Sequence, residues 1–426
     1  MSDTDLERGL GRRLIRNLTA QSLTQVLVTL MGLVTTYVLT RTLDVASFGG
    51  FTYIFATIYI FLSLNDLGIN ITLVREIAQY PERTEELVQN VIGLRLVLAL
   101  ISVVVGWIVV GILAPPAAYQ LATRVFFLIL PIQAFAVPGA ILQANIAIRR
   151  GAAIDIVNRT TGFVLMMLAV WMGQGLLFVT IALVCGEIAG ALMVIALTRH
   201  VVTPRPRFDF AVWRRVMRTS LPLGGQSILI AILNRFDSLM LERLGGMQQL
   251  AFYGAAYRLP SLFERVPQLV MATVFPIMSR LAVSDPVALK RLYHRTLGGM
   301  ALLAIPVAGG VIWLAPLIVR LWFPAVFESV GPLLRVVILA TAVLFPGVCA
   351  GSLLIALNKP RANLLAGVVA TALNIGLNFL WIPTHGAMGA AWATVVSLGV
   401  LCTLTIALAE LALNRAVREH GVAVGL

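Results

Sequence analysis

The sequence predicts an all-α polytopic membrane protein with twelve transmembrane helices in two six-helix bundles, and three observations support this prediction. Of the 426 residues, 59% are hydrophobic and only 12% are charged, whereas about a quarter of the residues in a soluble domain are charged. The apolar residues form continuous runs, and Lys and Arg are divided unequally between alternate connections. A water-soluble enzyme is therefore excluded, and so is a disordered chain, which needs low hydrophobicity.

Each expected span has the roughly 17–25 apolar residues, or more, that a helix needs to cross a bilayer. Continuous apolar runs, rather than alternation with a period of two, favour helices over a membrane barrel. The expected spans are residues 18–40, 48–73, 88–114, 122–147, 155–172, 176–198, 220–242, 251–279, 296–318, 332–357, 363–383 and 387–412.

The distribution of basic residues predicts the orientation. If the N-terminus is cytoplasmic, 22 Lys and Arg residues lie on the cytoplasmic side and 4 on the other, namely Arg41, Arg124, Arg243 and Arg320. Cytoplasmic loops of membrane proteins carry such an excess. We therefore expect a multi-pass protein of the cytoplasmic membrane with both termini cytoplasmic. The net charge of +13 then belongs to these loops and gives no reason to expect nucleic acid as a partner.

The longest cytoplasmic connection divides the chain into an N-terminal bundle (1–200), a linker (201–219) and a C-terminal bundle (220–426). Phe210, Trp213 and Met217 share one face of the linker, and arginines occupy the other face. This pattern predicts a short amphipathic helix on the inner leaflet. The basic and polar segment 1–16 precedes an apolar run too long for a signal peptide, so we expect it to be retained.

An internal repeat supports the division into halves. Segments 142–197 and 353–408 align at an offset of about 210 residues, and each has a basic turn, an apolar helix ending in Trp171 or Trp381, a glycine-containing turn and another helix. Parallel repeats of this kind are a common plan of transporters, with the substrate site at the repeat interface.

Polar stripes mark the spans that face a substrate or another helix. They occur in spans 18–40, 48–73, 220–242 and 251–279, and their members include Gln25, Asn70, Ser261 and Gln268. Helix packing also favours small and hydroxyl residues, so contact between helices is an open alternative for those positions.

Charged residues inside spans are costly and suggest a functional role. The cations are Arg95, Arg159, Arg235, Arg258, Arg265 and Arg335, and the acids are Asp66, Glu187, Asp237 and Glu264. Arg159 and Arg335 lie close enough to span ends to reach the membrane surface. We expect Arg258 and Arg265 to project from one face of span 251–279. An arginine fork suits phosphate, so an anionic substrate and a conformational latch of ion pairs both remain open.

Motifs of known enzyme chemistry are missing from the sequence. There is no GxxxxGK[ST] phosphate loop, no HExxH and no paired His/Cys spacing. Cys185, Cys349 and Cys402 lie in apolar runs and are expected to be free thiols. We therefore expect neither catalytic residues, nor a bound cofactor or metal, and the chain is not expected to be an enzyme.

Several motifs resemble one family. Segment 47–53 (SFGGFTY), followed by 64–70 (LNDLGIN) and 74–78 (VREIA), resembles the first-hairpin signature of polysaccharide flippases of the multidrug/oligosaccharidyl-lipid/polysaccharide (MOP) exporter superfamily. Segments 233–238 (LNRFDS) and 252–258 (FYGAAYR) resemble the matching signature of the second half, and 386–393 (GAMGAAWA) resembles the last-hairpin pattern.

The resemblance implies two bundles around a central V-shaped, MATE-like cleft that opens alternately to each side. It implies a polyprenyl-diphosphate-linked oligosaccharide as substrate, with the head group in the cleft and the tail in the bilayer. Arg258 and Arg265 would then contact the diphosphate, and the other substrate-binding candidates are Arg235, Arg95, Ser261, Gln268, Gln25 and Asn70. Asp66, Asp237 and Glu264 would be gating or coupling carboxylates.

Other functions stay open at this point. A cation-coupled drug exporter of the same fold would favour acids over arginines in the cleft. A saccharide polymerase or glycosyltransferase needs a larger extramembrane region than the short far-side loops provide, and a scaffold leaves the intraspan arginines unexplained. The expected partners are the lipid-linked oligosaccharide, membrane lipids and polysaccharide assembly proteins. The sugar, the coupling ion (H⁺ or Na⁺) and the oligomeric state are not determined by the sequence.

Overall fold

The computed structural model describes residues 24–113, 115–145 and 148–424, and within them every regular element is a helix. The described residues form two compact units, residues 1–231 and 232–426 in chain order, and the division falls inside a long helix, α10 (Phe210–Arg258). The expected retained segment 1–16, and the first residues of the expected span 18–40, lie outside the described part of the chain.

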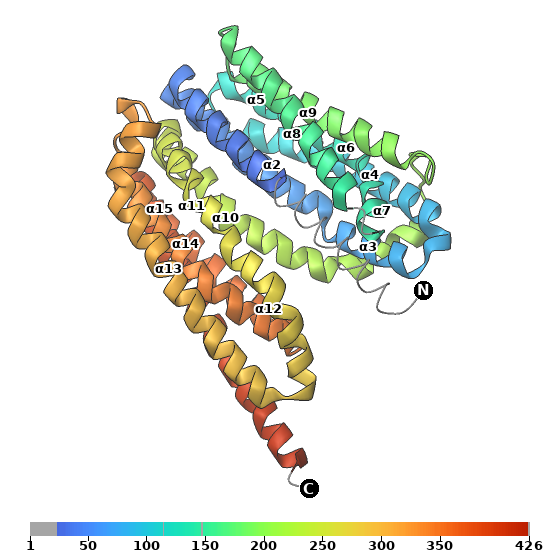
Figure 1. Cartoon of the computed structure of the whole chain (residues 1–426). Coiled ribbons are helices and arrows are strands. Elements are labelled where there is room, and N and C mark those ends of the chain that lie inside the picture. The colour runs from blue at the N-terminus through green and yellow to red at the C-terminus, as the bar shows by residue number, and fades with distance from the viewer. Residues whose placement is uncertain (1–23, 114, 146–147, 425–426) are drawn as a thin grey trace. The chain divides into compact units, whose positions relative to one another are not determined.

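The first unit begins with helical residues 24–42, which belong to the first expected span. It continues with α2 (Val45–Asp66), α3 (Ile69–Gln79), the short 3₁₀ helix η1 (Pro81–Arg83), α4 (Thr84–Leu113), α5 (Ala117–Phe126), α6 (Ile129–Ala134), α7 (Gly139–Ala144), α8 (Ile148–Trp171), α9 (Leu176–Thr198) and the first part of α10. α4 packs against α2 and α6, and α9 packs against α5 and α8 (Figure 1).

The second unit contains the rest of α10, α11 (Pro260–Phe263), α12 (Arg265–Ser284), α13 (Pro286–Trp322), the 3₁₀ helix η2 (Ala325–Phe327), α14 (Val330–Ala356) and α15 (Pro360–Val424). α14 packs against α12, α13 and α15 and is the central helix of this unit (Figure 1). α10 and α15 are each interrupted by a glycine with a positive φ, Gly246 at 83° and Gly386 at 54°. Glycine adopts this backbone conformation without a steric penalty.

Within the described residues, nine helical segments are long and apolar enough to cross a membrane. Two of them, Ser227–Ser284 and Pro360–Glu419, have 58 and 60 residues, and each can cross twice because one crossing takes about 20 residues. Each therefore accounts for two of the expected spans, and Gly246 and Gly386 lie between the members of each pair. The expected all-helical polytopic membrane fold is confirmed.

Three expected spans are not the continuous helices that the apolar runs predict. Segment 48–73 is divided between α2 and α3 at Leu67 and Gly68. Segment 122–147 is divided among α5, α6 and α7. Pro131 lies in the first turn of α6 and Pro138 directly precedes α7, and each proline lacks the N–H that would continue the preceding helix. Segment 251–279 is interrupted between Arg258 and Arg265, where Pro260 starts the four-residue α11. The expectation that Arg258 and Arg265 project from one uninterrupted helix is therefore wrong.

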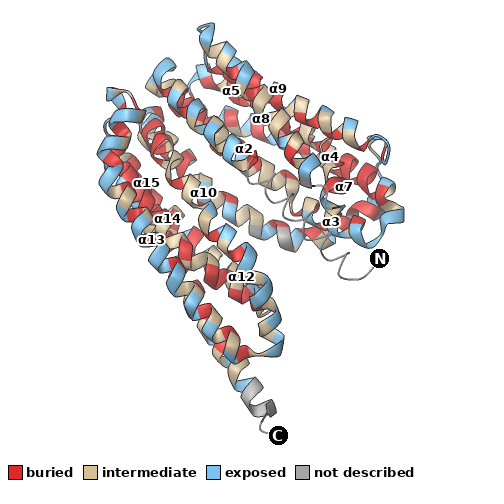
Figure 2. Cartoon of the chain, viewed as in Figure 1, coloured by how far each residue is buried: buried red, intermediate tan, exposed pale blue. Residues whose placement is uncertain are grey.

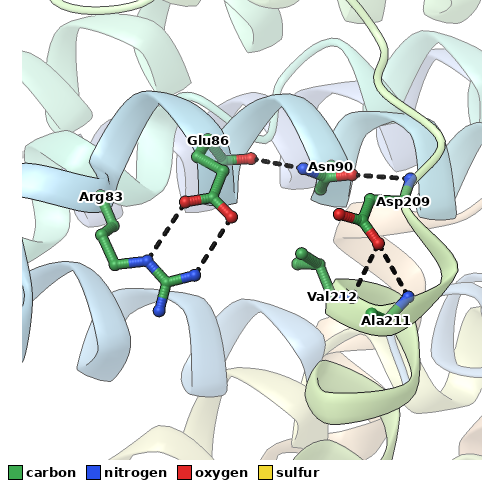
Figure 3. A network of polar contacts seen from close by, with 6 residues as sticks. All are labelled: Arg83, Glu86, Asn90, Asp209, Ala211 and Val212. Atoms are coloured by element: carbon green, nitrogen blue, oxygen red, sulfur yellow. Dashed lines mark hydrogen bonds and ion pairs between the residues drawn. The ribbon is translucent and has the colours of Figure 1, made fainter.

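The linker between the expected bundles is fixed to α4 (Figure 3). The Asn90 side chain accepts a hydrogen bond from the backbone N–H of Asp209 at 3.0 Å, and the indole N–H of Trp213 donates to the backbone oxygen of Asn90 at 2.9 Å. Gly93 permits the close approach, since a Cβ there would lie 2.0 Å from the backbone oxygen of Arg207.

The apolar face of the linker helix therefore has partners inside the protein. Trp213 and Val216 are buried with Val88 and Ile92 of α4, and Met217 packs against the same cluster. Phe210 is 76% exposed and remains available to a membrane surface. The expected domain limits stay a prediction, while the compact units divide further along, between Ala231 and Ile232.

Burial within each unit follows the helix faces (Figure 2). Small and aliphatic residues are buried between α13, α14 and α15, including Ala304, Ala350 and Ala409, because small side chains let membrane helices approach closely. Large apolar side chains on the outer faces are exposed, for example Trp171 at 84% and Trp313 at 80%. In a bilayer these faces contact lipid.

Candidate functional sites within the two units

In the first unit, the charged residues of two spans meet at a helix break. α2 ends at Asp66, and Leu67 (φ 46°) and Gly68 (φ 73°) turn the chain into α3. The Asp66 carboxylate forms an ion pair with the guanidinium of Arg95 in α4, and their side chains are 32% and 12% exposed. Each of these residues therefore offsets the charge of the other inside the membrane-spanning region.

A close backbone contact holds this break in place. Gly224 of α10 packs against Leu67 so closely that a Cβ on Gly224 would lie 2.4 Å from the Leu67 backbone oxygen. No other residue type fits there without a shift of one backbone, because real Cβ atoms do not approach that closely. The Leu67–Gly68 break, next to the Asp66–Arg95 pair in the chain, is thus packed against the first part of α10.

The remaining polar candidates of the first unit make contacts separate from the Asp66–Arg95 pair. The Asn70 amide in α3 donates to the Gln143 side chain of α7 at 3.4 Å, and Gln25 is half-buried on the first described helix. Glu187 of α9 accepts a hydrogen bond from Gln133 of α6 at 3.4 Å. Asn70 and Glu187 therefore join helices of the unit, as expected of polar residues at helix interfaces.

In the second unit, Asp237 lies at the centre of a buried hydroxyl network. Its side chain, 2% exposed, accepts hydrogen bonds from the backbone N–H of Ser238 at 2.6 Å, from the Ser238 hydroxyl at 3.2 Å and from the Tyr253 hydroxyl. The Tyr253 hydroxyl also lies 3.4 Å from the Thr394 hydroxyl of α15. Asp237 therefore connects two parts of α10 with α15 through neutral donors.

The other charged candidates of this unit gather beside the interrupted segment. Arg258 is the last residue of α10, Glu264 directly precedes α12, and Arg265 is the first residue of α12. Arg235 lies within electrostatic range of Asp237, Arg258 and Glu264, and Arg265 lies within range of Glu264. The structure therefore brings all five charged candidates of the second unit into one cluster.

The two polar candidates of α11 and α12 have different environments. The Ser261 hydroxyl donates to the backbone oxygen of Arg258 at 2.9 Å. The usual helical donor to that oxygen, the Leu262 N–H, bonds to the Leu259 oxygen instead. Gln268 is exposed, and so is Arg265, whereas Arg258 and Glu264 are half-buried. Arg265 and Gln268, three residues apart in α12, are therefore the members that a solute can reach most easily.

Sequence reasoning missed three residues of the Asp237 network, namely Tyr253, Tyr257 and Thr394. The rings of Tyr253 and Tyr257 pack with centroids 4.8 Å apart. Their spacing of four residues, which puts both on one helix face, was a signal that could have found them. Thr394 had none, because its contact joins residues 141 positions apart.

Bound metal has no evident site in the described residues, where no group of three His, Cys, Asp or Glu side chains lies close enough to hold an ion. The three cysteines are free, with Cys349 and Cys402 buried and Cys185 half-buried, as expected. Charged groups at interrupted membrane helices are instead the arrangement that secondary transporters use to bind ionic solutes. The fold and its polar clusters thus define a transporter-like class of membrane protein.

Comparison with known proteins agrees with this class. The chain belongs to the family described as Polysaccharide biosynthesis protein, whose profile matches residues 14–282. A curated relative, the probable flippase AglR of Haloferax volcanii, is 31% identical over 187 residues, which cover 43% of this chain and 38% of the relative. The matched region therefore spans about two fifths of that curated relative.

Solved structures of MOP-superfamily fold are similar to the whole chain. An inward-facing MATE-family multidrug resistance transporter of the MOP superfamily aligns with a TM-score of 0.77 at 17% identity, covering 91% of this chain and 95% of its own. The lipid II flippase MurJ, in an inward closed conformation, aligns with a TM-score of 0.78 at 14% identity, covering 93% and 89%. The fold is thus MATE-like, and the relative and both solved structures are named as transporters or flippases.

Proposed function

We propose that this protein is a flippase that moves a polyprenyl-diphosphate-linked oligosaccharide, of the type used as a repeat unit for surface polysaccharides, across the cytoplasmic membrane by alternating access. The observation that carries the proposal is the charged cluster of the second unit, in a chain of the Polysaccharide biosynthesis protein family. Arg235, Arg258 and Arg265 place three cations within one membrane-embedded region, with Arg265 exposed. Membrane-embedded charge of this kind is retained where an ionic solute passes.

The three arginines of the cluster outnumber its two acids, Asp237 and Glu264, so its excess charge is opposite in sign to that of a diphosphate diester. Arg265, exposed at the start of α12, is the first contact, and Arg258 at the preceding break is the second. Guanidinium forks bind phosphate oxygens in pairs, and the exposed amide of Gln268 offers hydrogen bonds to the sugar. Arg95 has a smaller part, because its charge is already paired with Asp66.

The carboxylates have the coupling role in this proposal. Asp237 is held by hydroxyl donors that connect α10 with α15, so a change in its protonation or in a bound Na⁺ would alter the contact between those helices. Forming or breaking the Asp66–Arg95 ion pair would strengthen or loosen the contact between α2 and α4. The 22-to-4 division of basic residues supports cytoplasmic termini in this proposal.

The test is a flipping assay in proteoliposomes with a fluorescent polyprenyl-diphosphate oligosaccharide. The variant is Arg258→Ala/Arg265→Ala, and the matched control is Arg41→Ala/Arg243→Ala, which removes two arginines outside the cluster. We expect protein-dependent crossing to fall at least about tenfold in the first variant and to persist in the control.

The other outcomes change either the role of the arginines or the function. Equal crossing in both variants would remove the arginines from the substrate path and leave them as a latch. A chain that moves no diphosphate lipid but exports an organic cation would be the drug exporter, the alternative supported by the fold shared with the MATE transporter.

A further inference from the structure

A second basic site lies in the second unit, away from the charged cluster around Arg258 in the sequence and on different elements. A cavity of about 880 Å³ lies where α13 ends and α14 begins, and its lining comes from α13, η2, the connection between them and α14. Ligand pockets in proteins commonly measure about 300–1,000 Å³. The cavity is therefore large enough to hold a polar head group together with the first atoms of its chains.

The polar groups of the cavity are two cations, one acid and one hydroxyl. Arg320 of α13 and Arg335 of α14 line it together with Glu328 and Ser329, and all four residues are exposed. No ion pair joins either arginine to a carboxylate in the part of the chain that the structure describes. The cavity thus has an excess of positive charge, with Glu328 able to accept a hydrogen bond from a hydroxyl.

The rest of the lining and its surroundings are apolar. Pro316, Val319, Phe323, Pro324 and Pro332 form the walls. Trp313 and Leu317, at seven and three residues before Arg320, are 80% and 52% exposed on the same helix. Their spacing places them on the face of α13 that carries Arg320, so an apolar surface runs from the cavity toward the middle of the membrane.

We propose that this cavity binds the phosphate of a membrane lipid, with Arg320 and Arg335 on the phosphate oxygens, Glu328 on a head-group hydroxyl and the acyl or prenyl chain along Trp313 and Leu317. Two guanidinium groups suit a phosphate that has one charge and several acceptor oxygens. The position between the end of α13 and the start of α14 is at the depth where lipid head groups lie, because both helices are membrane-spanning segments. This site is separate from the proposed transport path and does not require that proposal to hold.

The lipid can come from two sources with this chemistry. One is a resident phospholipid with a hydroxyl-bearing head group, such as phosphatidylglycerol, which would use both arginines and Glu328. The other is a polyprenyl phosphate, which has no head-group hydroxyl and would use the two arginines alone. Free phosphate is a third, non-lipid ligand, and it lacks the chain that the apolar face of α13 would hold.

The test measures lipid binding to the full, delipidated chain by native mass spectrometry and by thermal shift, with phosphatidylglycerol, polyprenyl phosphate, phosphatidylcholine and inorganic phosphate as probes. The variant is Arg320→Gln/Arg335→Gln, and the control is Arg41→Gln/Arg243→Gln, which changes the net charge equally. We expect the first variant to bind one of the two anionic lipids at least about tenfold more weakly, and the control to bind like the unaltered chain. The lipid that loses affinity identifies the source.

Glu328→Gln separates binding from damage to the fold. It removes the only acid that lines the cavity, so anionic lipid should bind equally or more tightly, whereas a distorted cavity would bind more weakly. Equal lipid affinity of the two double variants would overturn the proposal. So would binding of inorganic phosphate as strong as that of either lipid, because the apolar face would then have no part.

Discussion

The two units place acids and arginines at interrupted helices in opposite ways. In the first unit, Asp66 and Arg95 pair directly beside the Leu67–Gly68 break. In the second, the hydrogen-bond donors to Asp237 are Ser238 and Tyr253, which are neutral. The difference shows that an intramembrane acid and an intramembrane arginine on neighbouring spans do not by themselves indicate a substrate site, because the same residue types also form a structural ion pair.

The comparison assigns different roles to the two units. In the first, the opposite charges cancel inside the unit and secure a bend. In the second, hydroxyl groups of Ser238 and Tyr253 donate to Asp237, and three arginines accompany the two acids of the cluster. We therefore expect anion binding to depend mainly on the second unit, and the following experiments test this contrast.

The largest effect is expected from removing one member of the Asp66–Arg95 pair. Asp66→Ala leaves the mostly buried guanidinium of Arg95 without its carboxylate. Breaking a buried pair in this way costs about 3–5 kcal/mol of stability, and the cost here is smaller because water reaches part of the Asp66 side chain. Thermal unfolding of Asp66→Ala, Arg95→Ala and the double variant in one detergent gives the coupling energy. Strictly additive effects would show that the pair has no energetic role.

A smaller effect is expected from filling the contact between Gly224 and Leu67. Gly224→Ala places a Cβ 2.4 Å from a backbone oxygen, and the resulting shift should cost about 1–3 kcal/mol. Gly225→Ala is the control in the same helix, since a Cβ there meets nothing within 4 Å. Gly389→Ala in α15 is equally crowded, at 2.4 Å from the Trp381 oxygen.

Combining the glycine variants with the Asp66→Ala/Arg95→Ala double-mutant cycle tests whether the Gly224–Leu67 contact supports the ion pair. Gly224→Ala should lower the Asp66–Arg95 coupling energy, whereas Gly389→Ala should destabilise the chain without changing that coupling. If both variants change the coupling equally, the close contact at Leu67 does not hold the pair in place.

The Asp237 network should respond more mildly to the loss of a single donor. Tyr253→Phe removes one hydrogen bond to a buried carboxylate and should cost about 1–3 kcal/mol, while Thr394→Val, which removes a 3.4 Å contact, should cost less. Thermal unfolding measures both. A larger loss for Thr394→Val than for Tyr253→Phe would contradict the central position of the tyrosine.

The smallest effects concern the acids that cap one helix in each unit. Asp44 accepts one backbone hydrogen bond, from Ser47 at 3.2 Å, and Asp285 accepts two, from Val287 at 3.0 Å and Ala288 at 2.9 Å. Replacement of such a cap by alanine costs about 1 kcal/mol, and Asp285→Ala should cost more than Asp44→Ala. Equal shifts in thermal unfolding would show that the second bond adds nothing.

The Asp44 cap also predicts a dependence on pH. The side-chain hydrogen bond with Ser47 holds the pKa of Asp44 below its usual value of 3.8. The carboxylate therefore stabilises the folded chain at pH values above the pKa of the unfolded state, and this contribution is lost as the pH falls through the lower folded value. Asp44→Asn should remove that acid-dependent part of the unfolding curve, and an unchanged curve would contradict it.

Much of the fold could be predicted because apolar run length is a local property. The twelve expected segments all contain helix, and the glycine-containing turns after Trp171 and Trp381 hold the positive-φ residues Gly173 and Gly386. The breaks were less evident, since Pro131, Pro138 and Pro260 lie in runs as apolar as an unbroken span. Prolines elsewhere, such as Pro306 and Pro346, are accommodated inside helices, so proline alone did not indicate which spans are divided.

The candidate site was predictable in its residue types but not in its partners. Arg95, Arg235, Arg258 and Arg265 stand out because charge is rare in apolar runs. Asp66 and Arg95 are 29 residues apart and Tyr253 and Thr394 are 141 apart, and no periodicity relates such positions. The cavity beside Arg335 was also missed, because that arginine lies near a span end, where reaching the membrane surface is a sufficient explanation.

The sequence by itself determined that this chain is helical, membrane-spanning and rich in intraspan arginine, because hydrophobicity and charge act residue by residue along the chain. Only the tertiary structure decided which charges cancel and which are held by neutral donors. That distinction depends on the packing of helices distant in sequence. Asp66 meets a guanidinium because α2 lies against α4, whereas Asp237 meets hydroxyl groups because Tyr253 and Thr394 converge on it.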